Sequence, residues 1–112
     1  MISRTYKTEP LKDNPHMVDV RKLYDESSAQ IMHITLQAGE SLKPHKTPVN
    51  VAFYVLEGNP TILVDHESVS MGADTLVESP AHLIHCISNE GPGIARILVI
   101  KAPRPETATK VL

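Results

Sequence analysis

The strongest constraint on the fold of this chain is how often its apolar stretches are interrupted. Short runs rich in Val, Ile, Leu and Thr are separated throughout by Gly, Pro, Asn and Asp, and no segment shows a long helical period with caps. Glycine and proline at such spacing keep regular elements short. The pattern predicts an all-β protein, a sandwich or small barrel, formed as a single domain over residues 1–112.

The apolar runs define the predicted strands, and the polar ends fall outside them. Residues 1–15 and 103–112 are expected to be loosely held ends or arms. The main strands are predicted at Val18–Leu23, Ala29–Leu36, Val49–Leu56, Thr61–Asp65, Thr75–Glu78, His82–Ile87 and Ile94–Lys101, with shorter pieces at Leu42–His45 and Ser68–Ser70.

Two blocks of the sequence carry histidines at regular spacings. In the first, Gly39 is followed after five residues by His45, and the block ends at Gly58. In the second, His85 is followed after three residues by Asn89. Together the blocks resemble the two motifs of the cupin family. The resemblance implies a double-stranded β-helix, or jelly-roll, barrel of two antiparallel sheets.

Three positions depart from the family motifs. The family's second histidine is Thr47 here, its glutamate falls on Val51, and the glycine of its Pro-x-Gly is His82. A divalent transition metal usually takes at least three His or carboxylate ligands, which Thr47 and Val51 do not supply. The resemblance therefore implies a degenerate site in which His45, His82 and His85 hold Fe, Ni, Mn or Zn, with waters filling the other positions.

The resemblance also places His45 and His85 at the mouth of the barrel. Because side chains alternate along a strand, the face of His45 continues to Thr47, Val51 and Phe53. These three residues are predicted to line a largely aliphatic pocket. Truncating either histidine to alanine is expected to leave folding nearly intact.

The remaining histidines leave alternatives open. His33, on the preceding predicted strand, is a second candidate for a third imidazole, whereas His16 and His66 lie in polar surroundings and are expected to be exposed. Imidazoles also move protons without a metal. Some sugar-nucleotide epimerases of the superfamily pair a histidine with an acid and a tyrosine, but Tyr54 has the opposite parity to His45. An epimerase is therefore the weaker enzymatic alternative.

Charge and composition exclude several classes of partner. Eleven basic and thirteen acidic residues give a net charge of −2 without long runs of either sign, so neither a nucleic-acid surface nor a membrane-binding patch is predicted. The polar first residues lack the apolar stretch of a signal peptide. A lone cysteine, Cys86, suits a reducing compartment. These features predict a cytoplasmic protein.

Two predicted strands are apolar on both faces. Val49–Leu56 and Ile94–Ile100 have almost no polar positions, although a strand of an open sandwich normally turns one face to solvent. A second subunit covering the outer face explains this pattern and predicts a homodimer. A tail of the same chain folded over the strands is the alternative.

The sequence therefore supports three functions. The first is a pocket that binds a small molecule through a degenerate divalent-metal site. The second is a metal-dependent enzyme of the oxygenase or isomerase type, and the third is a dimeric barrel with a structural or partner-binding role. No catalytic residue is assigned, and whether the protein is an enzyme stays open.

Overall fold

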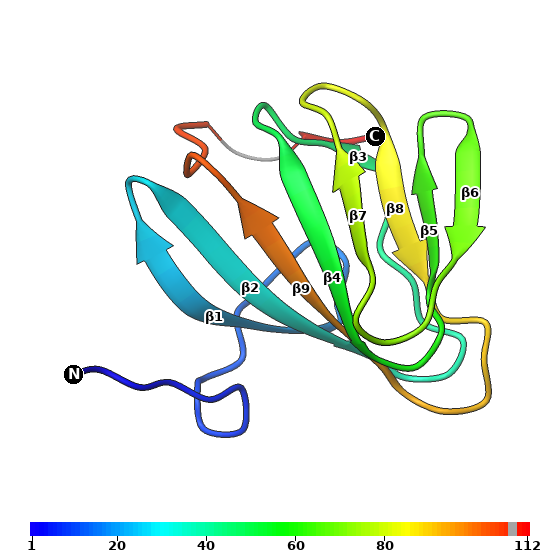
Figure 1. The fold of residues 1–112 in the computed structure, drawn as a ribbon, viewed down its shortest axis with the longest axis horizontal. Helices are drawn as coiled ribbons and strands as arrows, with labels where there is room; N and C mark the ends of the chain where they lie inside the picture. Colours follow the sequence, from blue (N-terminus) through cyan, green and yellow to red (C-terminus); the bar gives the residue numbers. More distant parts are fainter. Residues whose placement is uncertain (108–109) are drawn as a thin grey trace.

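The computed structural model describes residues 1–107 and 110–112, which form two five-stranded antiparallel sheets facing each other (Figure 1). Sheet A has the order β1-β2-β9-β4-β7, and sheet B has the order β10-β3-β8-β5-β6. The strands are β1 (Asp19–Glu26), β2 (Ala29–Leu36), β3 (His45–Lys46), β4 (Val51–Glu57), β5 (Thr61–Val64), β6 (Glu67–Ser70), β7 (Leu76–Ser79), β8 (His85–Ser88), β9 (Ala95–Lys101) and β10 (Lys110–Val111). The predicted all-β double-stranded barrel is confirmed. No helix long and apolar enough to span a membrane occurs among the described residues.

Alternating side chains of the two sheets form the core. The inward positions of β4 and β9 face those of β5 and β8, and burying such a side chain stabilises the fold by about 1.5–3 kcal/mol. The core residues of these four strands are Val51, Phe53, Val55, Ala95, Ile97, Val99, Ile62 and Ile87. Because the core occupies the middle of the barrel, the space near β3 and the ends of β2 and β9 is left for a cavity.

The predicted strand ends agree with the structure where nearby turn-forming residues determine them. The range Ala29–Leu36 matches β2, but the predicted strand His82–Ile87 is too long because β8 begins at His85. His82 has a φ of 69°, and its amide donates to the carbonyl of Thr47. A residue in the left-handed region cannot continue a strand, so the chain turns at His82.

Two residues of the histidine-bearing blocks hold turns together. Gly58 has a φ of 82°, and a Cβ there would lie 2.6 Å from the carbonyl oxygen of Ile94. Asn89 is buried, and its side-chain amide donates to the carbonyls of Leu36 and Gly93. Both motif positions therefore have structural roles in the turns that close the barrel.

Residues 1–18 form an N-terminal arm that wraps around the β1 edge of sheet A. The Lys12 amide donates to the Val20 carbonyl, and Arg21 donates to the carbonyl of Glu9. On the outer face of the sheet, the Tyr6 ring stacks on His33 with centroids 4.1 Å apart. The arm is thus attached at several points, whereas the sequence predicted residues 1–15 to be loosely held.

The outer cluster consists of Tyr6, His33 and Arg96. The Arg96 guanidinium lies 4.7 Å from the centroid of the Tyr6 ring and donates to His33 Nε2 at 3.3 Å. His33 Nδ1 is buried and has no hydrogen-bond partner among the described residues. In this region the chain's own arm covers the β2 part of the outer face.

The C-terminal segment ends in a strand. The predicted loose end, 103–112, lies partly outside the described residues, which omit 108–109. Its last residues form β10, which pairs with β3 and places Val111 opposite His45. The amide of Leu112 also donates to the Pro44 carbonyl. Hydrogen bonds between the backbones of β10 and β3 hold this end of the chain, and amino-acid composition does not predict such pairing.

Candidate functional site

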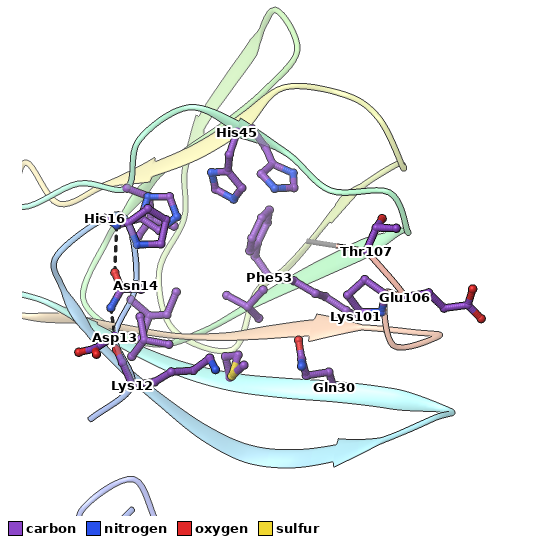
Figure 2. Close-up of a pocket in the computed structure, with 18 residues that line it drawn as sticks. Lys12, Asp13, Asn14, His16, Gln30, His45, Phe53, Lys101, Glu106 and Thr107 are labelled. Carbon is purple, nitrogen blue, oxygen red and sulfur yellow. Dashed lines mark hydrogen bonds between the residues drawn. The ribbon is translucent and has the colours of Figure 1, made fainter. Parts of the chain in front are cut away.

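A cavity of about 510 Å³ opens at the end of the barrel where the N-terminal arm meets β3 and β9. Figure 2 shows His45 on one side of it, Phe53 near its centre, and Lys12 and Gln30 on the opposite side. Its apolar lining comes from Val20, Met32, Ile34, Leu42, Phe53 and Val99. Such a mixture of apolar wall and few polar groups is typical of a small-molecule site.

The pairing of β3 with β8 places two imidazoles side by side. His45 and His85 are register partners, so both side chains lie on the same face of sheet B. Their ring centroids are 4.4 Å apart, and Phe53 contacts the His85 ring at 5.1 Å. The sequence prediction that the two histidines meet at the barrel mouth agrees with this arrangement.

The main chain of Lys43 orients two of the rings. Its carbonyl oxygen accepts a hydrogen bond from His45 Nδ1 at 2.7 Å, and its amide donates one to His16 Nδ1 at 2.8 Å. A carbonyl only accepts and an amide N–H only donates. Neutral His45 therefore keeps a lone pair on Nε2, whereas neutral His16 carries its proton on Nε2. The two rings, 4.8 Å apart, offer one acceptor and one donor.

His85 has partners at both ring nitrogens. Ser79 Oγ lies 2.8 Å from Nδ1, and Thr47 Oγ1 lies 3.3 Å from Nε2. Both hydroxyls can donate or accept, so they satisfy either neutral tautomer. Because His85 is only 1% exposed, it acts as a buried wall of the cavity. Nε2 of His45 is then the nitrogen best placed to meet a ligand.

Burial keeps the three rings neutral. It is the main cause that lowers the pKa of His85 to about 3 and the pKa of His16 to about 4, with His45 and nearby lysine side chains adding to the effect. Burial also lowers the pKa of His45. At neutral pH these rings therefore act as fixed donors and acceptors. We refer to His16, His45 and His85 as the inner cluster.

The residues predicted to form the site separate into two groups. Phe53 lines the cavity with His45 and His85, and Thr47 lies behind them as the partner of His85. Val51 is buried in the core and does not line this cavity. His82 is exposed at its turn and is not part of the cavity lining. His33, the other candidate for a third imidazole, belongs to the outer cluster.

His16 and Lys101 are among the polar cavity residues that were not identified from the sequence. His16 was expected to be exposed, but it is half-buried against His45, because the N-terminal arm crosses the barrel mouth. No local signal marks this position, which depends on the Lys43 amide 27 residues away. Lys101 also lines the cavity. Its parity with inward-facing Val99 was a signal for that placement. His66 is exposed, as expected.

The two facing sheets and the cavity at one mouth define an all-β barrel with one open end. Residues 32–101 match the Cupin domain family, so the chain belongs to the cupin family. No curated protein sequence matches the chain.

Solved structures with the same fold cover nearly the whole chain. TT1209 from Thermus thermophilus is 24% identical, with a TM-score of 0.80 over 94% of this chain and 100% of that one. An RmlC-like cupin family protein from Methanocaldococcus jannaschii is 27% identical, with a TM-score of 0.76 over 95% of each chain. The polyketide cyclase RemF from Streptomyces resistomycificus is 17% identical, with a TM-score of 0.79 over 100% of this chain and 86% of that one. These similarities establish the fold.

Cupins often hold a divalent metal, but the donors at this mouth do not fit one. Within the described part of the chain, no group of three His, Cys, Asp or Glu side chains is arranged to hold a metal ion. Thr47, at the position of a family ligand, is hydrogen-bonded to His85 Nε2 and so engages the nitrogen that a metal would need. His16 Nδ1 accepts from a main-chain amide. Of the three rings described at this mouth, His45 is the one left with an available lone pair, on Nε2.

Proposed function

We propose that the protein binds a small organic molecule in the barrel-mouth cavity without a metal, through hydrogen bonds to the inner cluster. The proposal rests on the two hydrogen bonds that the main chain of Lys43 makes to these rings. They leave His45 Nε2 as an acceptor and His16 Nε2 as a donor. A ligand hydroxyl can donate to the first ring and accept from the second. The apolar lining favours a ligand with an aliphatic or aromatic body.

The partners of His85 support this proposal over a metal-dependent enzyme. Ser79 and Thr47 satisfy the ring within the protein, so His85 can shape the cavity without contacting a ligand atom directly. Phe53 packs on its edge and adds an aromatic surface. A buried aromatic surface beside a few fixed polar groups is typical of sites that recognise an organic molecule by shape and hydrogen bonding.

The proposal can be tested with benzyl alcohol and toluene, which share an aromatic body and differ by one hydroxyl group. Chemical shifts of cavity amides should report tighter binding of benzyl alcohol to the wild type. The His45→Leu variant should lose that preference and bind the two probes alike, whereas the His66→Leu control, at an exposed histidine, should retain it. Equal binding of both probes to the wild type would overturn the role of the inner cluster.

We also propose that two copies pair through the outer face of sheet A. Leu98, Ile100 and Ala52 lie side by side on this face and are half-buried. The arm contacts the neighbouring β2 region through Tyr6, so the apolar β4–β9 part of the sheet remains for a second copy. Self-pairing through one apolar patch gives the two-fold symmetric dimer that small proteins most often form.

Light scattering after gel filtration tests the dimer. The wild type should elute with twice the mass of the chain, and Leu98→Lys should elute as a monomer with an unchanged circular-dichroism spectrum. Ile94→Lys places the same charge at an exposed position outside the strands and serves as the control. A monomeric wild type at concentrations of about 100 μM, where specific interfaces are normally formed, would contradict the proposal.

A further inference from the structure

We propose that the cavity selects organic anions, with the Lys101 side chain holding a carboxylate or phosphate group of the ligand. The inference rests on the proposed function, because it names the class of molecule that the same cavity takes. It goes beyond the hydrogen bonds of the inner cluster by assigning a second, charged contact to the last residue of β9.

The register of sheet A places Lys101 inside the barrel. It follows Ala95, Ile97 and Val99 on the inward face of β9, and all three of those residues are buried. A lysine at a strand end usually extends its ammonium group into water. Here the side chain is half-buried and lines the cavity.

Two lysines, Lys12 and Lys101, line the cavity together with the inner cluster. Lys101 lines the same cavity as all three imidazoles of the inner cluster, and its charge helps to lower the pKa of each ring. The pKa of Lys101 is itself lowered, mainly by burial and then by the charge of Lys12, which also lines the cavity. A half-buried ammonium group beside three neutral rings favours a negatively charged ligand, because an anion reduces the cost of burying a cation.

The acidic residues of the lining lie at its rim. Asp13 and Glu106 line the cavity and are both exposed, and in Figure 2 their carboxylates point outward. They are therefore solvated, whereas Lys101 is half-buried. A volume of about 510 Å³ with apolar walls exceeds the needs of a bare inorganic anion, so the anionic group belongs to an organic ligand.

The experiment uses mandelate, which is benzyl alcohol with an added carboxylate, and mandelamide, its neutral analogue of nearly equal size. Phenyl phosphate is the third probe and distinguishes a phosphate from a carboxylate. Affinities of the full chain are measured by chemical-shift titration at constant ionic strength. Mandelate or phenyl phosphate should bind wild type at least tenfold more tightly than mandelamide does.

Lys101→Met should remove that tenfold preference and leave the affinity for mandelamide unchanged, because methionine keeps the apolar stem without the charge. Lys101→Arg should restore part of the preference. Lys46→Met removes a charge from β3, where Lys46 has the opposite parity to His45, and should change nothing. Circular dichroism and melting temperature confirm that the variants fold.

The outcomes separate the two proposals. Equal binding of mandelate and mandelamide, both weakened in His45→Leu, would overturn the anion inference and leave the proposed function standing. An anion preference that persists in Lys101→Met would also overturn the inference. Tight mandelate binding that needs Lys101 but not His45 would support the inference and overturn recognition by the inner cluster. Absence of binding by all three probes at 20 mM would overturn both.

Discussion

The inner and outer clusters each contain a buried histidine, the first inside the barrel mouth and the second on the outer face of sheet A. His85 and His33 are both 1% exposed. Burial lowers the pKa of the first to about 3 and that of the second to about 4. By these measures the two residues are alike, yet the first lies beside a cavity and the second lies under a stacked tyrosine.

What separates the clusters is the space beside the rings and the identity of their partners. In the inner cluster, the main chain fixes a donor and an acceptor next to a cavity. In the outer cluster, Arg96 hydrogen-bonds to His33 and Tyr6 stacks on its ring, so the protein's own side chains cover this histidine. A lowered pKa is thus a consequence of burial and does not identify a site unless a cavity accompanies it.

The largest expected effect is the conversion of the inner cluster into a metal site. The substitution Thr47→His adds a third imidazole beside His45 and His85 and removes the hydroxyl that engages His85 Nε2. The variant T47H should retain close to one equivalent of Ni²⁺ after desalting, because three imidazoles then lie at one mouth of the barrel. Elemental analysis of the desalted protein measures the gain.

The wild type should retain no nickel under the same conditions, and adding nickel should raise the melting temperature of T47H only. Stoichiometric nickel in the wild type would show that two histidines suffice at this mouth. It would contradict the metal-free interpretation of the inner cluster.

Truncation of His85 should lower the free energy of unfolding more than truncation of an exposed residue at the barrel mouth would. His85→Ala removes a packed ring and leaves Ser79 and Thr47 without their partner, which should lower the free energy of unfolding by about 3 kcal/mol. Urea unfolding measures the change. The sequence alone predicted that folding would stay nearly intact. A loss below about 1 kcal/mol would support that earlier prediction, which treats the ring as accessible.

The free energy of unfolding should decrease as the pH is lowered, and His33 should account for part of the decrease. Burial, followed by the charge of Arg96, lowers the pKa of His33 from the usual 6.5 to about 4. As the pH falls below 6.5, the unfolded chain takes up a proton that the folded chain does not. The free energy of unfolding therefore decreases toward pH 4, by up to about 1.4 kcal/mol per pH unit for this residue.

His33→Phe keeps a ring against Tyr6 and removes the titration. Its unfolding free energy should decline less steeply between pH 6.5 and 4, although His16 and His85 still contribute with the same sign. Chemical denaturation at several pH values gives the slope. A slope identical to that of the wild type would show that His33 is protonated in the folded protein as readily as in the unfolded one.

The smallest effect is expected from Tyr6. Tyr6→Ala removes the stack on His33 and the contact with Arg96, and should lower the free energy of unfolding by about 1 kcal/mol. Exposure of the ring should also raise the pKa of His33 toward its usual value, which an NMR titration of the His33 ring measures. Probe binding in the cavity should stay unchanged, and a weakened cavity would show that the two clusters are coupled.

The sequence predicted correctly those strands whose ends are determined by neighbouring turn-forming residues. The range of β2 was predicted correctly because turn-forming residues flank it on both sides. The start of β8 was predicted too early because the left-handed conformation of His82 is fixed by a hydrogen bond to Thr47, far away in the sequence. Pairing of β10 with β3 likewise depends on a long-range contact that composition does not encode.

For the site, the motif spacing predicted the pair His45 and His85, since their strands lie in register. It also predicted a role for His82, but the side chain is exposed at its turn. His16 was missed because its contact with Lys43 exists only in the folded chain. Strand parity alone would have placed Lys101 inside the barrel.

The N-terminal arm has a practical consequence for anyone who shortens this chain. Its residues look dispensable, because no strand among the described residues begins before Asp19. Yet the arm supplies Tyr6 to one cluster and His16 to the other, and Lys12 to the cavity wall. A truncated protein that still folds would have lost one wall of its cavity and the partner of the Lys43 amide. Ligand screening with such a fragment would return false negatives.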